Sequence, residues 1–311
     1  MTTVGPQLDL SGIQPPPSDA DGSMGQVMSA TKKRLTSKWA SLAAVVLAVA
    51  WTVPTFGLLI SSFRPARDIA TSGWWTAFTD PQFTLDNYKE VLSTTGTSSL
   101  APYVVNSIVI TIPAVIIPIL IASLAAYAFA WMHFKWRNAI FIAVFALQIV
   151  PIQVTLIPLL SLYADVGIAG TYWAIWISHT MFGLPLAVFL LHNFMKEIPG
   201  ELIEAARVDG AGHVTIFFRL ILPMLKPAIA ALAIYQFLWV WNDLLVALTF
   251  AGSSKTVAPM TVALFNLTGT RGSQWYLLTA GAFVSIIVPV VVFLSLQRYF
   301  VRGLLAGSVK G

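Results

Sequence analysis

The stretch "YVVNSIVITIPAVIIPILIASLAAYAFAW", residues 103–131, contains no charged side chain. A helix needs about 20 consecutive, mostly apolar residues to cross the hydrocarbon core of a bilayer, so this stretch predicts a transmembrane helix. Five further blocks are long and apolar enough to do the same, approximately at residues 39–62, 138–163, 172–194, 227–250 and 275–299. The sequence therefore predicts an all-α membrane protein with six transmembrane helices.

The composition of the 311-residue chain supports this prediction. Hydrophobic residues make up 57% and charged residues 10%, and the mean hydropathy is +0.78. A soluble globular domain averages about 45–50% apolar and about 25% charged residues. A large soluble core would show helical or strand periodicity, and transmembrane strands would show short alternating segments, whereas these blocks are continuous.

Several prolines fall inside the apolar blocks. Neighbouring helices can satisfy the carbonyl groups that a proline leaves without a donor, so we expect kinks at these positions and no breaks. They are Pro54, Pro113, Pro118, Pro151, Pro158, Pro185 and Pro289.

The basic residues predict the orientation of the chain. If the N-terminus is cytoplasmic, most of the 18 lysines and arginines fall on the cytoplasmic side, as the positive-inside rule requires. The exceptions are Arg64, Arg67, Lys89, Lys255 and Arg271. Both termini are thus predicted to be cytoplasmic. The net charge of +5 is then explained by basic residues that face the cytoplasmic leaflet of the membrane, and no nucleic-acid partner is expected.

The apolar blocks also set the predicted domain limits. Residues 1–37, which contain "GIQPPPSDADGS", form a disordered cytoplasmic N-terminal tail in this interpretation. Residues 38–302 form the six-span transmembrane domain, and residues 303–311 form a cytoplasmic C-terminal tail. The first block is too long for a cleavable signal and is expected to be a retained anchor.

Residues for catalysis or metal binding are not evident. The chain has no cysteine, and its four histidines lie outside the spacings of metal ligands. The stretch "AGSSKT", residues 251–256, lacks the glycine that a phosphate-binding loop has before its lysine. We therefore expect no catalytic residue, no metal site and no cofactor bound by this chain.

One segment that contains charged residues, glycines and prolines separates the fourth and fifth blocks, at about residues 197–226. Its central part reads "EAARVDGAGHVTIFFRLILPMLKP", residues 204–227. A short helix is predicted from Pro199 to just before Gly210, which is suited to the left-handed backbone that ends a helix. A second amphipathic piece follows it. From composition alone, the segment would be a hairpin that lies on the membrane surface.

The spacing of Glu204-Ala205-Ala206, Asp209-Gly210 and Leu222-Pro223 instead resembles the EAA loop of bacterial ABC importer permeases. Leu220 stands where that family usually has isoleucine. The resemblance extends from about residue 40 to the end of the chain. "SFRPARDIA", "FTLDNYKEVL", "WVWNDLL" and "LQRYFVRGLLAGSVKG" are similar to carbohydrate importers of the maltose-G type, and "SGWWTAFTDPQFTLDNY" resembles alpha-glucoside permeases.

The resemblance implies an ABC type I importer permease fold in the bacterial plasma (inner) membrane. It implies import of carbohydrates, either alpha-glucosides or other oligosaccharides. The implied partners are a second homologous permease, two ABC ATPase subunits that bind and hydrolyse ATP, and an extracytoplasmic sugar-binding protein. The EAA loop would couple the permease to an ATPase subunit through Glu204, Ala205, Ala206, Asp209, Gly210 and Pro223.

A candidate for the substrate pathway lies in "FLWVWNDLLVALTF", residues 237–250. On a continuous helix, Trp239, Asn242 and Asp243 share one face. A carboxylate inside the membrane should face the bundle or a wet cavity, and hydrogen-bonding groups beside an aromatic face suit a sugar. The alternative is that Asp243 only bonds a neighbouring helix.

Two other function classes remain as alternatives. A secondary transporter of a small polar solute would normally show several ionisable residues in its spans, whereas only Asp243 is found here, without an evident internal repeat. A membrane enzyme would need a catalytic constellation, and the sequence shows none.

Overall fold

The computed structural model describes residues 38–93, 99–269 and 272–306, with side chains described as far as residue 296. The predicted N-terminal tail and the last five residues lie outside these ranges. The chain divides into two units, residues 1–57 and 58–311, and each is considered by itself. The described part of the first unit belongs to one apolar helix, α2 (Lys38–Ser62), which ends in the second unit.

The described residues form helices and no strand. Four helical segments among them are long and apolar enough to cross a membrane: α2, α5 (Ala101–Trp131), α8 (Tyr172–Lys196) and Trp275–Leu296 of α15 (Trp275–Ala306). Two bent helix pairs raise the number to six if each pair is one span. These segments agree with the predicted all-α membrane class.

The predicted third span is bent and not merely kinked. α6 (Arg137–Ala146) and the short η2 (Leu147–Ile149) meet α7 (Ile152–Asp165) at 99°. A proline disfavours the helical region for the residue before it, and Val150 is extended at φ −73° and ψ 119°. The expectation of a kink without a break was therefore wrong at Pro151.

The second bent pair is His213–Met224 with Lys226–Trp241, at 71°, so it begins before the predicted fifth span of residues 227–250. That predicted span is itself interrupted. α12 (Lys226–Trp241) ends at Asn242, and a separate helix, α13 (Leu245–Ala251), begins three residues later. Asn and Asp side chains favour helix ends over helix interiors because they compete for backbone hydrogen bonds. The premise that residues 239–243 form one helical face was therefore wrong.

Short helices fill the connections. They are α3 (Ala66–Thr71), η1 (Trp74–Phe78), α4 (Asp86–Leu92), α9 (Gly200–Val208), α10 (His213–Thr215), the π-helix η3 (Ile216–Ile221), α11 (Leu222–Met224) and α14 (Met260–Thr268). The last of the long helices, α15, runs to Ala306 and includes the first four residues of the predicted C-terminal tail.

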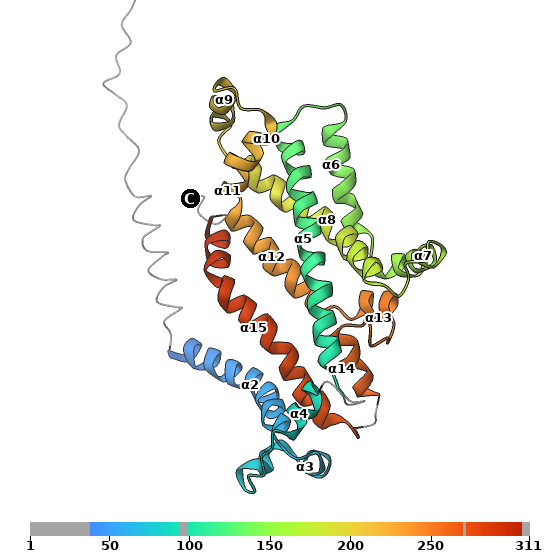
Figure 1. The fold of residues 1–311 in the computed structure, drawn as a ribbon. Helices are drawn as coiled ribbons and strands as arrows, with labels where there is room; N and C mark the ends of the chain where they lie inside the picture. The colour runs from blue at the N-terminus through green and yellow to red at the C-terminus, as the bar shows by residue number, and fades with distance from the viewer. Residues whose placement is uncertain (1–37, 94–98, 270–271, 307–311) are drawn as a thin grey trace, which may run out of the picture. The chain divides into compact units, whose positions relative to one another are not determined.

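Within the second unit, α5 packs along α8 and α12, and α12 packs against α15 (Figure 1). Buried side chains form two clusters that follow α5. Its first half, with Ile110 and Ala114, packs with α13 and α14. Its second half, with Ala122 and Ala126, packs with α8, α9 and η3. The hairpin of α9 and α10 thus lies at the end of α5 that is opposite to α13 and α14.

Three prolines that do lie inside helices show how the bundle tolerates them. In a helix, the carbonyl four residues before a proline loses its normal N–H donor. In three such cases, a side chain of a neighbouring helix donates instead: Trp176 Nε1 to Val109 O at 3.1 Å, Gln236 Nε2 to Ala114 O at 3.3 Å, and Trp241 Nε1 to Ser285 O at 3.1 Å. The prolines concerned are Pro113, Pro118 and Pro289. For these three, the predicted satisfaction of the freed carbonyl by neighbouring helices is confirmed.

Candidate functional site

The hairpin between α8 and α12 is closed by main-chain hydrogen bonds at the end of α9. Gly210 has a φ of +83° and its N–H donates to Arg207 O at 3.0 Å. The N–H of Ala211 donates to Ala206 O at 2.9 Å. This pair of bonds is a Schellman motif, which ends a helix with a left-handed residue and turns the chain sharply. The predicted left-handed conformation of Gly210 is confirmed.

The hairpin is fixed to the end of α5 by buried and polar contacts. Ile203 on α9 and Phe217 on η3 are both buried in the second cluster. The hydroxyl of Tyr127 on α5 lies 3.0 Å from His213 Nδ1, and Arg207 Nη2 donates to Trp131 O at 3.4 Å. The position of the hairpin relative to α5 is therefore set by contacts on both of its arms.

The opposite side of α9 is open. Glu204 and Ala205 are exposed, Ala206 is half-buried against the second cluster, and Val208 is 88% exposed. The exposed apolar side chain of Val208 lies on the same helix as the Glu204 carboxylate and the small Ala205. Together they form a surface that is open to close approach by another protein.

The remaining residues predicted for coupling lie in the same hairpin. Asp209 is the exposed C-cap of α9, and Pro223 is exposed at the start of α11. Pro223 has no N–H to give to the carbonyl of Arg219, and the π-helix η3 occupies this stretch.

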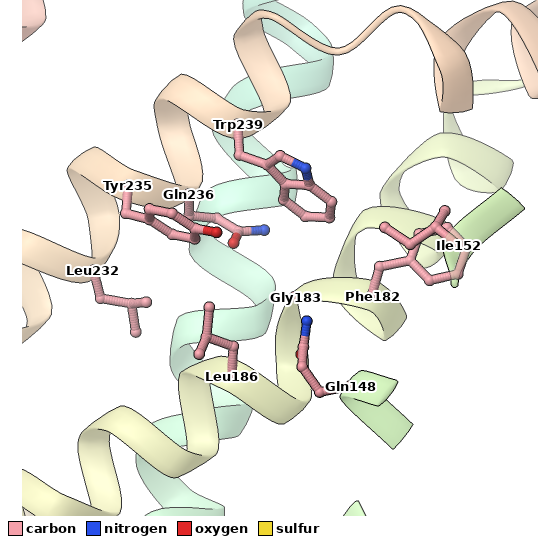
Figure 2. A pocket seen from close by; sticks show the side chains of 9 residues that line it. All are labelled: Gln148, Ile152, Phe182, Gly183, Leu186, Leu232, Tyr235, Gln236 and Trp239. Atoms are coloured by element: carbon pink, nitrogen blue, oxygen red, sulfur yellow. The ribbon is translucent and has the colours of Figure 1, made fainter. Parts of the chain in front are cut away.

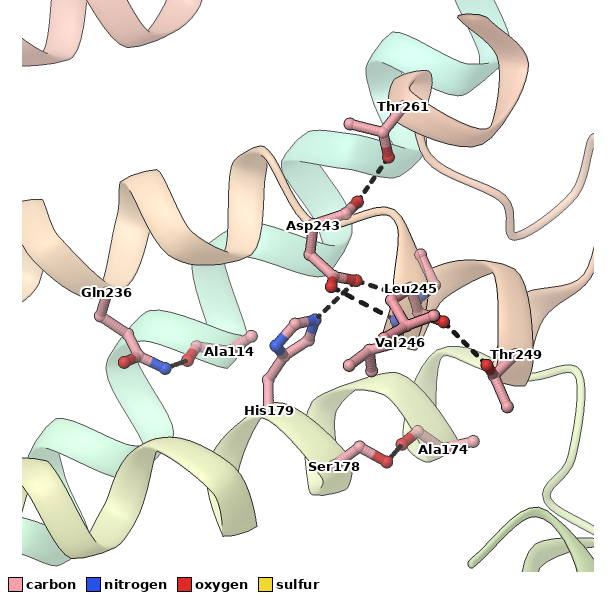
Figure 3. Close-up of polar contacts among 11 residues, drawn as sticks. Ala114, Ala174, Ser178, His179, Gln236, Asp243, Leu245, Val246, Thr249 and Thr261 are labelled. Atoms are coloured by element: carbon pink, nitrogen blue, oxygen red, sulfur yellow. Dashed lines mark hydrogen bonds and ion pairs between the residues drawn. The ribbon is translucent and has the colours of Figure 1, made fainter. Parts of the chain in front are cut away.

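Asp243 lies in the break between α12 and α13 and caps the second helix. Its Oδ1 accepts from the N–H of Val246 at 3.3 Å and its Oδ2 from the N–H of Ala247 at 2.9 Å (Figure 3). The carbonyl of Asp243 accepts from Thr261 Oγ1 at 2.6 Å, which ties the break to α14. Asp243 is therefore engaged in holding the start of α13.

His179 on α8 faces Asp243 from the side. Its Nε2 lies 3.7 Å from Asp243 Oδ2, and its side chain is only 1% exposed. This separation is too long for a direct hydrogen bond. The imidazole also meets the Trp239 ring edge-on, with centroids 5.1 Å apart. The buried imidazole of His179 thus lies between the carboxylate of Asp243 and the ring of Trp239. The sequence analysis did not predict this arrangement.

The three residues predicted for the substrate pathway are not brought to one surface. Asn242 is exposed, and its Nδ2 turns back to the carbonyl of Leu238 at 2.8 Å. Trp239 lines a pocket, whereas Asp243 points toward α8 and α13. The geometry therefore separates the tryptophan from the two polar groups.

The pocket lies between η2 and α7 on one side and α8 and α12 on the other (Figure 2). Its lining residues combine apolar side chains with two carboxamides and a tyrosine: Gln148, Ile152, Phe182, Gly183, Leu186, Leu232, Tyr235, Gln236 and Trp239. Sequence reasoning missed all of these except Trp239. Gln236 offered a signal, since it is the first polar carboxamide in the apolar block that begins at residue 227.

Within the described ranges, no three histidine, aspartate or glutamate side chains come together as metal ligands. The polar groups of the pocket can donate and accept hydrogen bonds but include no charged side chain of either sign. Such a lining suits a neutral, hydroxyl-bearing solute.

Several apolar helices of membrane length, together with a shorter helix that is interrupted beside a capping carboxylate, are typical of membrane transport proteins. The chain belongs to the family of binding-protein-dependent transport system inner membrane components, whose sequence profile matches residues 118–305. It is therefore the inner membrane component of a transport system, as the resemblance of its EAA segment predicted.

Similar proteins cover nearly all of the chain. The osmoprotective compounds uptake permease protein GgtD of Synechocystis sp. is 54% identical over 285 residues, which are 89% of this chain and 95% of GgtD. The alpha-glucoside transport system permease protein AglG of Rhizobium meliloti is 53% identical over 243 residues, 76% of this chain and 63% of AglG. The melibiose/raffinose/stachyose import permease protein MelC of Bacillus subtilis is 34% identical over 272 residues, 87% of this chain and 96% of MelC.

Two solved structures share the fold. One is a bacterial ABC transporter involved in the import of the acidic polysaccharide alginate, with a TM-score of 0.67, 19% identity, and coverage of 92% of this chain and 100% of that one. The other is a bacterial alginate ABC transporter in complex with an alginate pentasaccharide-bound periplasmic protein, with a TM-score of 0.62, 16% identity, and coverage of 86% and 95%. The predicted ABC importer permease fold is confirmed.

Proposed function

We propose that this chain is the permease subunit of an ATP-driven importer of neutral carbohydrates, either alpha-glucosides or other oligosaccharides. AglG and MelC are described as permeases for such sugars. The description of GgtD names osmoprotective compounds, which leaves room for a small polyhydroxylated solute as well. The lining of the pocket contains no arginine, lysine or histidine to pair with a carboxylate, which supports a neutral substrate over the acidic alginate of the structural relative.

The single observation that carries the proposal is the hairpin of α9 and α10. It is held rigidly on α5 while Glu204 and Ala205 face outward. A surface docked there would move α8 and α12 with it, because the hairpin and the short η3 and α11 that follow it connect these two helices. We infer that an ATPase subunit binds this surface and that its ATP-driven closure is passed on as a rigid-body movement.

The assembly follows from this role. A second permease completes the pathway, two separate ATPase subunits hydrolyse ATP, and a sugar-binding protein delivers the substrate on the other side. The hairpin then lies in the cytoplasm, and so do both chain termini. In this arrangement the secondary transporter is the competing function, and it would continue to take up solute in proteoliposomes that hold no ATP.

Trp239 serves the substrate pathway in this proposal, together with the region of Asn242 and Asp243. We expect Trp239→Ala to reduce uptake without reducing assembly with the ATPase. Trp173→Ala is a suitable control, because Trp173 is 60% exposed on α8 and does not line the pocket. Uptake that is normal in Trp239→Ala over a range of sugar concentrations would assign this tryptophan to packing.

The decisive experiment uses two glycines of the hairpin. Gly210 has a positive φ and Gly212 has an ordinary φ of −75°, and a Cβ at either position meets no atom within 4 Å. A side chain at Gly210 therefore costs about 1–2 kcal/mol of backbone strain without any clash, and Gly212→Val tests the added bulk alone.

We expect Gly210→Val to insert in the membrane but to lose uptake and to retain less ATPase subunit on purification. Gly212→Val should behave like the wild type in both measurements. Wild-type uptake by Gly210→Val would refute the docking role of the hairpin. The sugar itself is best identified by a binding screen of the cognate external protein against di- and oligosaccharides.

A further inference from the structure

We propose that the pocket between η2, α8 and α12 is a solute site that belongs to this subunit itself, with Gln148 and Gln236 as its specificity-determining groups. The proposal rests on the function proposed above and names residues for it. Neutral sugars are bound by carboxamides and by aromatic faces, and both are present here in a mostly apolar lining.

Gln236 is the most buried of the polar groups, with 2% of its surface exposed. One end of its carboxamide is already used, since Nε2 donates to the carbonyl of Ala114. This bond fixes the side chain and leaves Oε1 without a donor from the described part of the chain. Because Gln236 also lines the pocket, a held acceptor is available to a sugar hydroxyl at little cost in side-chain entropy.

Gly183 on α8 is the residue that makes room for this carboxamide. A Cβ at this position would lie 2.7 Å from Gln236 Nε2 and 2.9 Å from Gln236 Oε1. Only glycine therefore allows the side chain to lie where it does. The backbone conformation of Gly183 is that of an ordinary helix, so close packing and not strain explains the glycine.

Gln148 supplies a second carboxamide from the opposite wall (Figure 2). It is exposed, lies in an apolar segment beside the 99° bend between η2 and α7, and makes no hydrogen bond with the described residues. A carboxamide that faced lipid would leave its polar atoms unsatisfied at a cost of several kcal/mol. Its surroundings are better explained by a solute and water than by hydrocarbon.

A neighbouring hollow extends the pocket along the bundle. It shares Gln148, Ile152 and Phe182 with the pocket and continues along α7 and α8 to Thr155 and Pro185. Phe182 and Trp239 supply aromatic faces to the pocket, and the edge-on contact with His179 fixes the tryptophan. The combined surface has the elements that a chain of sugar rings needs.

The test uses the complete transporter in proteoliposomes with saturating binding protein and radiolabelled maltose, sucrose and trehalose. The measured quantity is sugar taken up per ATP hydrolysed. We expect Gln148→Leu, Gly183→Ala and Gln236→Leu to lower this ratio by about 3- to 10-fold, the loss of about one hydrogen bond. ATP hydrolysis should continue, because none of these residues lies on the hairpin.

Trp241→Phe is the matched control. It removes an equivalent side-chain bond to a proline-freed carbonyl, that of Ser285, but does not line the pocket. Its uptake ratio should equal that of the wild type. An unchanged ratio in Gln148→Leu and Gly183→Ala, or an equal fall in Trp241→Phe, would overturn the proposed site. A wild type that transports none of the three sugars would instead overturn the proposed alpha-glucoside substrate and the site proposed for it.

Discussion

Gln236 on α12 donates to the carbonyl of Ala114 on α5, the carbonyl that Pro118 leaves without a donor. Trp241 on the same helix does the same for Ser285, four residues before Pro289 on α15. α12 therefore supplies donors to proline-altered sites on two neighbouring helices. These bonds connect the proline-containing parts of α5 and α15 to α12, the helix that follows the hairpin.

The Trp241–Ser285 bond can be measured by a double-mutant cycle. Trp241→Phe removes the indole N–H but keeps a ring that can stack on Phe237. We expect a loss of about 1 kcal/mol in the free energy of unfolding in detergent, within the range for hydrogen bonds between membrane helices. Pro289→Ala restores a backbone donor for Ser285, so Trp241→Phe should cost less in that background. Equal costs in both backgrounds would contradict the assigned pairing.

Asp243 offers a second stability prediction. Its carboxylate accepts from two N–H groups at the start of α13, so Asp243→Ala should lower the free energy of unfolding by about 0.5–2 kcal/mol. Asp243→Asn keeps one acceptor and should lose less than Asp243→Ala. Asn242→Ala is the control, because Asn242 is exposed and bonds only within its own helix. SDS titration of the purified variants measures the three effects, and a null effect of Asp243→Ala would show that the cap is not needed.

Arg64 organises the connection between α2 and α4. It is 4% exposed, and its guanidinium donates to two carbonyls and two hydroxyls: Ser72 O, Asp68 O, Ser72 Oγ and Thr76 Oγ1. Lysine cannot reproduce this planar fork of donors, so Arg64→Lys should lose several of these hydrogen bonds, at about 0.5–1.5 kcal/mol each. Faster protease cleavage within residues 65–85 is the expected readout.

Arg67→Lys is the matched control for that measurement, since Arg67 is exposed one helical turn away. It should be cleaved at the wild-type rate. Equal rates for Arg64→Lys and the wild type would show that the guanidinium does not hold this segment.

The C-terminal end supports a fourth prediction. Residues 303–306 continue α15, so a deletion of residues 303–311 shortens a helix as well as removing the tail. We expect this deletion to lower coupled ATPase activity in the reconstituted transporter. A deletion of residues 307–311 alone separates the two contributions, and full activity in both deletions would leave the end without a role in coupling.

The sequence was sufficient for the helical class, the apolar segments and the turn at Gly210, because each depends on local physics. Length and continuity of apolar residues define a span, and a glycine after a helix-forming run defines a left-handed end. The stretch before Pro151 also contained a local signal, because a proline restricts the backbone of the residue before it. Whether this restriction bends the chain depended on the tertiary context. Within a bundle the same kind of residue lies inside one continuous helix at Pro118 and at a 99° bend at Pro151.

The candidate pocket could not be derived in the same way. Gln148, Gly183 and Gln236 come from three separate segments, and no spacing rule relates them. The predicted face of Trp239, Asn242 and Asp243 assumed an unbroken helix, and the polar pair itself interrupts that helix. Distances between elements are a property of packing, which a single sequence does not contain.

The cap of α9 is made by main-chain atoms of Ala206, Arg207, Gly210 and Ala211. The side chains of Val208 and Asp209 at its tip therefore contribute nothing to the path of the backbone, and both are exposed. These two side chains can therefore be matched to the surface that docks there while the shape of the tip persists. Paralogous transporters in one cell could keep their subunits apart through such matching, with no need to redesign the fold.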